Sequence, residues 1–106
     1  MKLGIILNSK DPETAWNVLR LGNEALAAGN ETSVFLLGSG VEIENIKNDN
    51  FNVAEVLKKF VDNGGNLLAC GTCLELRHQE AGACHVSTMS QLVEIIAESD
   101  KVVTFG

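Results

Sequence analysis

The sequence lacks the features that would indicate a membrane, a secretory route or a nucleic acid. No apolar run approaches the ~20 residues that a membrane span needs, and the N-terminal run at residues 3–7 is too short for a signal peptide. The eight Lys and Arg residues are spread along the chain, with only Lys58 and Lys59 adjacent, and the net charge is −6, so no basic stripe could neutralise several phosphates at once. We therefore expect an intracellular, cytoplasmic protein that binds no membrane and no nucleic acid directly.

Cysteine and proline are also scarce. The chain has three cysteines, and an odd number argues against a fully paired disulfide framework. Cytoplasmic cysteines stay reduced unless they are catalytic, redox-active or metal-bound. The only proline is Pro12, so no cis-proline loop can face a cysteine pair as it does in thioredoxin-like enzymes. That type of oxidoreductase is disfavoured.

Nucleotide-binding motifs are missing as well. Gly38-Ser39-Gly40 lacks the third glycine of the dinucleotide fingerprint, and no Gly-Lys-Ser/Thr phosphate loop occurs. A flavodoxin-like flavin site would need a Ser/Thr-rich phosphate loop after the first strand, and none is present. We expect no bound cofactor.

What the sequence does contain is an ordinary globular composition with a regular alternation of segments. Its 106 residues are 45% hydrophobic and 21% charged, which fits one folded domain over residues 1–106. Continuous apolar runs are typical of strands buried on both faces of a parallel sheet. Five such runs occur, at Leu3–Leu7, Ser33–Leu37, Asn66–Cys70, Ala83–Val86 and Lys101–Phe105.

Helical patterns separate these runs. The first helix is predicted to follow the cap Asp11 and to end at Gly29, and the second to follow the cap Asn52. A shorter helix is expected from Thr72 to about Gln79, and the last follows the cap Thr88.

This order predicts an α/β fold with a five-stranded, mainly parallel sheet flanked by helices, as in flavodoxin-like proteins. Sites in such sheets form at the carboxyl ends of the strands. The polar segment 38–50 is expected to be a surface loop with at most one helical turn.

Cys70 is the strongest candidate for chemistry. It ends a buried strand and directly precedes a helix, where unpaired amides favour a thiolate. Thr72 adds a hydroxyl, and Gly71 lets a reacting sulfur approach closely. We expect Cys70 to be partly thiolate near neutral pH and Cys84 to stay protonated on a buried strand. The alternative is that Cys70 is a small core residue, because free cysteine is often buried.

Cys73 completes a Cys-x-x-Cys spacing, which occurs in thiol-disulfide enzymes and in zinc sites. Cys84 and His85 could complete a zinc set, but adjacent strand residues point to opposite faces, so no metal is the favoured expectation. Cys84 is interpreted as a core residue, His78 as a solvated helix-end residue, and Trp16 as a packing residue or a subunit contact.

Three segments, in their order and spacing, resemble the DsrE/DsrF-like family of small α/β proteins. They are Ala25–Gly29, Val34–Leu37 running into Gly40-Val41, and Cys70–Arg77. The resemblance implies a DsrE-like fold, a part in sulfur relay and a persulfide carried on Cys70. It also implies that Arg77 matches the arginine in the helix after that cysteine.

The resemblance implies further that the chain acts as a sulfurtransferase, taking sulfur from a persulfide protein and passing it to a thiol protein. It implies a homo-oligomer, a trimer or hexamer. Two other interpretations remain open: an oligomeric binding or regulatory module with structural cysteines, and a dithiol redox protein that uses Cys70 and Cys73.

Overall fold

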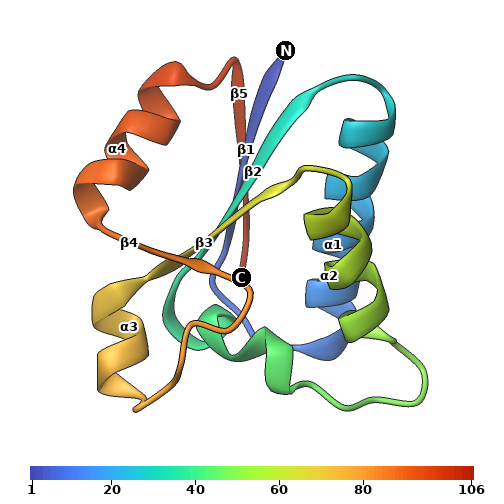
Figure 1. The fold of residues 1–106 in the computed structure, drawn as a ribbon, viewed down its shortest axis with the longest axis vertical. Coiled ribbons are helices and arrows are strands. Elements are labelled where there is room, and N and C mark those ends of the chain that lie inside the picture. Colours follow the sequence, from blue (N-terminus) through green and yellow to red (C-terminus); the bar gives the residue numbers. More distant parts are fainter.

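The computed structural model describes residues 1–106 as one α/β domain with helices on both faces of a sheet (Figure 1). The strands are β1 (Lys2–Leu7), β2 (Glu31–Leu36), β3 (Asn66–Cys70), β4 (His85–Ser87) and β5 (Lys101–Phe105). The helices are α1 (Pro12–Ala27), α2 (Val53–Asp62), α3 (Gly71–Leu76) and α4 (Met89–Glu98), with a 3₁₀-helix η1 (Gly38–Asn45). None of the helices combines the length and the apolarity needed to cross a lipid bilayer.

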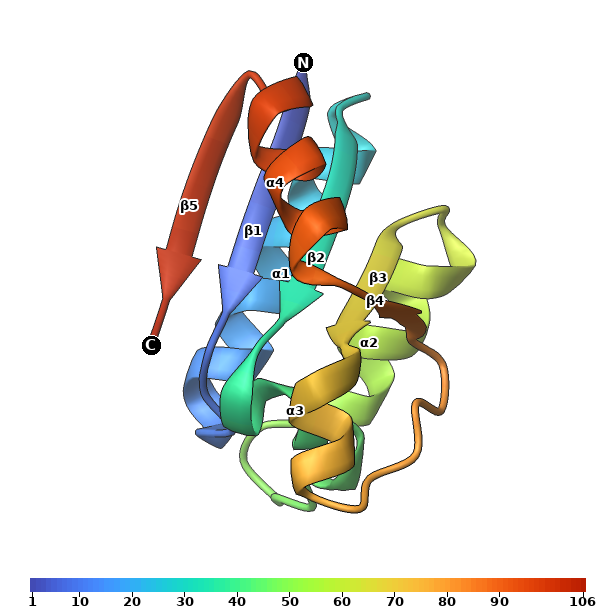
Figure 2. The same cartoon turned by 90° about the vertical axis from the view of Figure 1, so that its left-hand side faces the viewer.

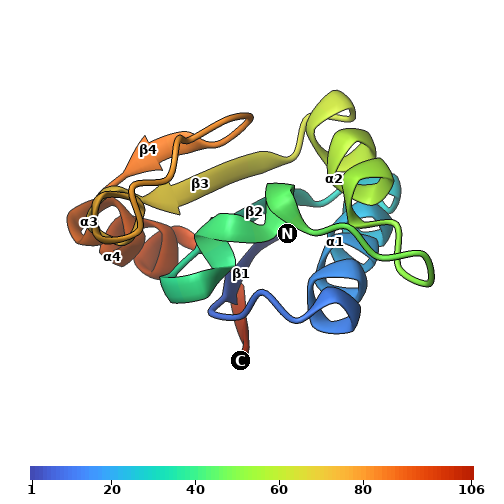
Figure 3. The same ribbon diagram turned by 90° about the horizontal axis from the view of Figure 1, so that it is seen from below.

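All neighbouring strands are parallel, which confirms the predicted fold class. Their order is β4-β3-β2-β1-β5. The chain adds strands to one side as far as β4, and α4 then crosses back so that β5 pairs with β1 (Figure 2). This differs from the flavodoxin order, 2-1-3-4-5. All five strands end at the same edge of the sheet, which Figure 3 shows from below.

The two faces of the sheet carry cores of unequal size. Leu67 and Ala69 of β3 belong to the larger core, which includes buried residues of α1 and α2. Leu68 and Cys70 alternate with them and belong to a smaller core with Phe35 and with residues of α4. Because successive residues of β3 are buried on opposite faces, its apolar run is continuous rather than alternating. The edge strands β4 and β5 are mostly exposed, contrary to the expectation of burial on both faces.

The predicted helix caps are confirmed. The side chains of Asp11, Asn52 and Thr88 accept hydrogen bonds from backbone amides in the first turns of α1, α2 and α4, at 3.0, 3.1 and 3.2 Å. These bonds satisfy amides that have no partner inside the helix.

The bounds of several elements differ from the prediction. β2 begins at Glu31 instead of Ser33, and β4 begins at His85 instead of Ala83, so Cys84 precedes the strand and does not lie on it. α3 ends at Leu76 instead of near Gln79, because His78 adopts a left-handed conformation with φ 50° and the Gln79 amide turns back to the Leu74 carbonyl. Segment 38–50 contains the eight-residue helix η1, since its apolar residues Val41 and Ile43 are buried in the larger core. A solvated loop would have exposed them.

The packing of α1 against α2 depends on a glycine in the middle of a helix. A Cβ added at Gly22 of α1 would lie 2.8 Å from Cε1 of Phe60, whose ring is fully buried. Glycine destabilises a helix interior by about 0.5–1 kcal/mol relative to alanine, so the close approach of the ring explains its presence.

We therefore expect Gly22→Ala to destabilise the protein by about 1–3 kcal/mol in urea unfolding, because the buried ring cannot move aside freely. Phe60→Leu in the same chain should remove most of that loss, so the double-mutant cycle should show coupling between the two positions. A gain in stability for Gly22→Ala alone would mean that helix propensity outweighs the contact.

Candidate functional site

Cys70 is the last residue of β3 and the cap residue of α3. It is only 3% exposed and packs in the smaller core with Phe35, Leu68 and Leu92. Ser87 at the end of β4 is its partner across the parallel pair. Cys70 therefore lies at the carboxyl edge of the sheet, as predicted, but beneath the surface.

Burial raises the pKa of the Cys70 thiol above its usual range. The amide of Cys73 opposes this rise, the Cys73 thiol adds to it, and the amide of Thr72 lowers the pKa slightly. The net direction is upward. The expectation of a partly ionised Cys70 near neutral pH is therefore wrong for this chain, because desolvation outweighs the amides at the start of a short helix.

Cys73 is half-buried and touches both cores. Its sulfur accepts a hydrogen bond from the backbone amide of Gly38, with N and Sγ 3.3 Å apart. Gly38 follows the end of β2, the strand next to β3. Two segments that are 35 residues apart in the sequence thus meet at this sulfur.

The two cysteines line a hollow of about 540 Å³ at this edge of the sheet. Its walls come from the start of α3, the end of β4 and the start of α4. The lining residues are Cys70, Gly71, Thr72, Cys73, Glu75, Val86, Ser87, Thr88 and Met89. The candidates Gly71, Thr72 and Cys73 are therefore brought together with Cys70.

Gly71 has a steric reason to be glycine. A Cβ at this position would lie 3.2 Å from Cγ1 of Val86 and 3.4 Å from the carbonyl oxygen of Ser87. The start of α3 thus fits closely against β4, and a side chain here would press into the wall of the hollow.

Arg77 does not line the hollow. Its guanidinium donates to the Cys73 carbonyl, with Nη1 and O 3.3 Å apart, and pairs with the Glu42 carboxylate, with Nε and Oε2 3.5 Å apart. Lys10 approaches the same carboxylate at 3.7 Å. In this structure Arg77 ties the end of α3 to η1 and has no contact with either sulfur.

Cys84 lies away from the hollow, in the larger core, as expected for a core residue. Its Sγ is 4.0 Å from Oε2 of Glu44, and burial together with this negative charge raises its pKa to about 12. His85 is exposed. No three or more His, Cys, Asp or Glu side chains are grouped so that they could hold a metal ion, so the four-residue zinc set is not assembled.

Some contacts of the site are not evident from the sequence. The contact between the Gly38 amide and the Cys73 sulfur could have been inferred, because the ends of neighbouring parallel strands meet at one edge. The Glu44 carboxylate accepts from the Ala83 amide at 3.1 Å. Because Glu44 is exposed in part and belongs to no motif, nothing in the sequence signals this contact.

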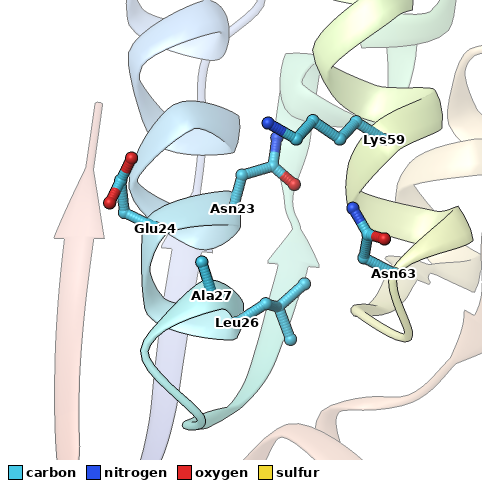
Figure 4. A pocket seen from close by; sticks show the side chains of 6 residues that line it. All are labelled: Asn23, Glu24, Leu26, Ala27, Lys59 and Asn63. Atoms are coloured by element: carbon cyan, nitrogen blue, oxygen red, sulfur yellow. The ribbon is translucent and has the colours of Figure 1, made fainter.

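A second hollow, of about 330 Å³, lies between α1 and α2 (Figure 4). Its lining is Asn23, Glu24, Leu26, Ala27, Lys59 and Asn63, with no thiol and no imidazole. Trp16 lies near this side of the molecule, where it packs against Phe51 and under the Arg20 guanidinium. The hollow with the two cysteines is therefore the better candidate for covalent chemistry.

The model of the DsrE/DsrF-like family matches residues 1–105. An uncharacterised protein of Methanocaldococcus jannaschii is 32% identical over 114 aligned residues, covering 99% of this chain and 100% of that protein. An uncharacterised protein of Methanopyrus kandleri is 32% identical over 101 residues, covering 88% of this chain and 83% of that protein.

Solved structures share the fold. A conserved protein of unknown function from Bacteroides thetaiotaomicron superposes with a TM-score of 0.79 at 20% identity, covering 98% of this chain and 94% of that one. A protein of unknown function from Methanobacterium thermoautotrophicum gives 0.75 at 12% identity, covering 96% and 97%. At these identities the likeness concerns the fold alone.

The raised pKa of Cys84 predicts a pH dependence of stability. In the unfolded chain this thiol loses its proton near the ordinary value of 9.0, whereas in the folded protein it keeps the proton to about pH 12. The stabilisation is complete below pH 9 and is lost as the pH rises toward 12, by at most about 1.4 kcal/mol per pH unit.

Urea unfolding at a series of pH values should therefore show a steeper alkaline decline for the native sequence than for Cys84→Ala. The other titrating groups are common to both proteins, so the difference between the curves isolates Cys84. Parallel curves would contradict the assignment.

Proposed function

This chain belongs to the DsrE/DsrF-like family, and on that premise we propose that it accepts a sulfane sulfur on Cys70 and passes it on as a cysteine persulfide. It would then act as a sulfurtransferase between a persulfide donor protein and a thiol acceptor protein. The observation that carries the proposal is the position of Cys70, at the carboxyl edge of the sheet and in the wall of a hollow large enough for a bound sulfur.

The transfer consists of two displacements at sulfur. The Cys70 sulfur attacks the outer sulfur of the donor persulfide, the donor's S–S bond breaks, and the donor leaves as a thiol with the proton of Cys70. The acceptor thiol then attacks the outer sulfur on Cys70, the S–S bond on Cys70 breaks, and the acceptor's proton passes to the Cys70 sulfur, which restores the Cys70 thiol. Each step exchanges one S–S bond for another, so no oxidant or reductant is consumed.

The surroundings of Cys70 fit this cycle. Because burial raises its pKa, the thiol stays protonated and hidden from bulk solvent between transfers. The amides of Cys73 and Thr72 lower the pKa, so they are the groups that would stabilise the sulfur anion once it forms. A donor that fills the hollow would bring its outer sulfur to the thiol directly.

Brief incubation of the reduced protein with inorganic polysulfide should add the mass of one sulfur atom, and peptide mapping of protein quenched at once should find it on Cys70. Cys70→Ser should abolish the uptake, because the hydroxyl does not accept sulfur. Cys84→Ala is the matched control and should take up sulfur as the native sequence does. Uptake by Cys70→Ser at the native rate would refute the assignment.

We also propose that the chain forms a homo-oligomer, a trimer or hexamer, as the family resemblance implies. Three apolar side chains of α4 face solvent on one stripe, with Met89 56%, Val93 65% and Ile96 46% exposed. A continuous apolar stripe at i, i+4 and i+7 is typical of a surface that a protein partner covers. Met89 also lines the hollow, so this interface would adjoin the thiol.

Light scattering on eluting protein should give the mass of a trimer or hexamer at micromolar concentration. Val93→Glu should lower that mass while the circular dichroism spectrum stays unchanged, because a carboxylate cannot be buried in an apolar interface without a large cost. Ser90→Glu, on the same helix but outside the stripe, should keep the native mass. A monomeric native protein would count against the proposal.

A further inference from the structure

We infer that Cys73 is the resolving thiol of this site: it attacks the persulfide on Cys70, releases hydrogen sulfide and leaves a Cys70–Cys73 disulfide. The inference rests on the proposed function of Cys70. It adds a second fate for the bound sulfur, which is reduced to sulfide in place of being passed to an acceptor thiol.

The positions of the two cysteines at the start of α3 bring both side chains to the same hollow. Cys70 is the cap residue and Cys73 is the third residue of the helix. The Cys73 side chain packs against the smaller core, of which Cys70 is a member. Both thiols line the hollow.

A contact from outside the helix holds Cys73 in place. The Gly38 amide donates to its sulfur at 3.3 Å, and would donate equally to a thiolate formed there. Gly38 adopts a left-handed conformation, with φ +53°, and a Cβ at this position would collide with Oδ1 of Asn8. The glycine thus permits the backbone to turn its amide toward the sulfur.

The two sulfurs differ in their exposure to solvent, and the difference suits an attack of Cys73 on a persulfide at Cys70. Cys70 is buried whereas Cys73 is half-buried. The outer sulfur of a Cys70 persulfide can occupy the hollow, while the inner sulfur, which Cys73 must attack, stays beside the neighbouring thiol. Nothing else that lines the hollow could resolve the persulfide, because no other thiol is present there.

The step balances without an added oxidant. Cys70–S–SH and Cys73–SH give Cys70–S–S–Cys73 and H₂S. The bond between the sulfane sulfur and the Cys70 sulfur breaks, and a bond forms between the two cysteine sulfurs. The sulfane sulfur takes the electron pair together with the proton of Cys73 and is reduced to sulfide, and the two cysteine sulfurs are oxidised. A reducing dithiol would return the pair to its starting state.

The test compares the native sequence with Cys73→Ser. Reduced protein is treated briefly with inorganic polysulfide and freed of excess reagent by gel filtration. Intact mass and free sulfide are then followed together. The native protein should lose the added sulfur and a further two hydrogens, with sulfide appearing at the same rate. Cys73→Ser should keep the sulfur and release no sulfide.

Two further variants secure the interpretation. Cys73→Ala should behave as Cys73→Ser does, which excludes an effect of the introduced hydroxyl, and Cys84→Ser should behave as the native sequence does. If the native protein and Cys73→Ser hold the sulfur equally, the inference is overturned and the proposed function stands. If neither takes up sulfur, the proposed function itself fails.

Discussion

The parallel direction of all five strands is the constraint on which the site depends. Because each strand ends at the same edge, the residues that follow β2, β3 and β4 are neighbours although they are far apart in the sequence. Cys70 ends β3, Gly38 follows β2 and Ser87 ends β4. The first two of these segments meet at the Cys73 sulfur, and the third is a wall of the hollow.

The unequal cores explain why a buried thiol lies close to solvent. The face that packs on α1 and α2 contains 18 buried residues of the core, whereas the face under α4 has four, Cys70 among them. Only one residue of α4, Leu92, is buried, and the outer side of the same helix is apolar. The thinly covered face is thus the one that carries Cys70, the proposed sulfur-bearing residue, and the exposed apolar stripe of α4.

The sequence was sufficient to predict elements whose signals are local. The caps Asp11, Asn52 and Thr88 each satisfy an amide of their own helix, so their residue types mark the helix starts. The apolar runs are also a local signal, and they mark the strands. The end of α3 depends on the left-handed conformation of His78, which the residue type does not signal. The helix η1 depends on distant contacts: Val41 and Ile43 look like residues of a polar segment until the core that buries them is known.

The candidate site was predicted only in part for the same physical reason. The cluster of Cys70, Gly71, Thr72 and Cys73 follows from one strand-to-helix turn, which is local. The position of Arg77 depends on Glu42, a residue of η1, and the sequence did not predict this helix at its observed length. In the same way, nothing near Cys84 in the sequence indicated the carboxylate of Glu44.

The ionisation of Cys70 shows why the magnitudes of two opposing effects must be compared. A helix terminus stabilises a nearby negative charge by about 0.3–1 kcal/mol at an exposed site, which is less than one pKa unit, since a unit corresponds to about 1.4 kcal/mol. Full burial can shift a pKa by several units in the opposite direction. The helix here has only six residues, and Cys70 is 3% exposed, so desolvation prevails. A thiol in this position is therefore kept protonated by the core that surrounds it. It would become a nucleophile where a donor bound in the hollow takes the proton as the new S–S bond forms.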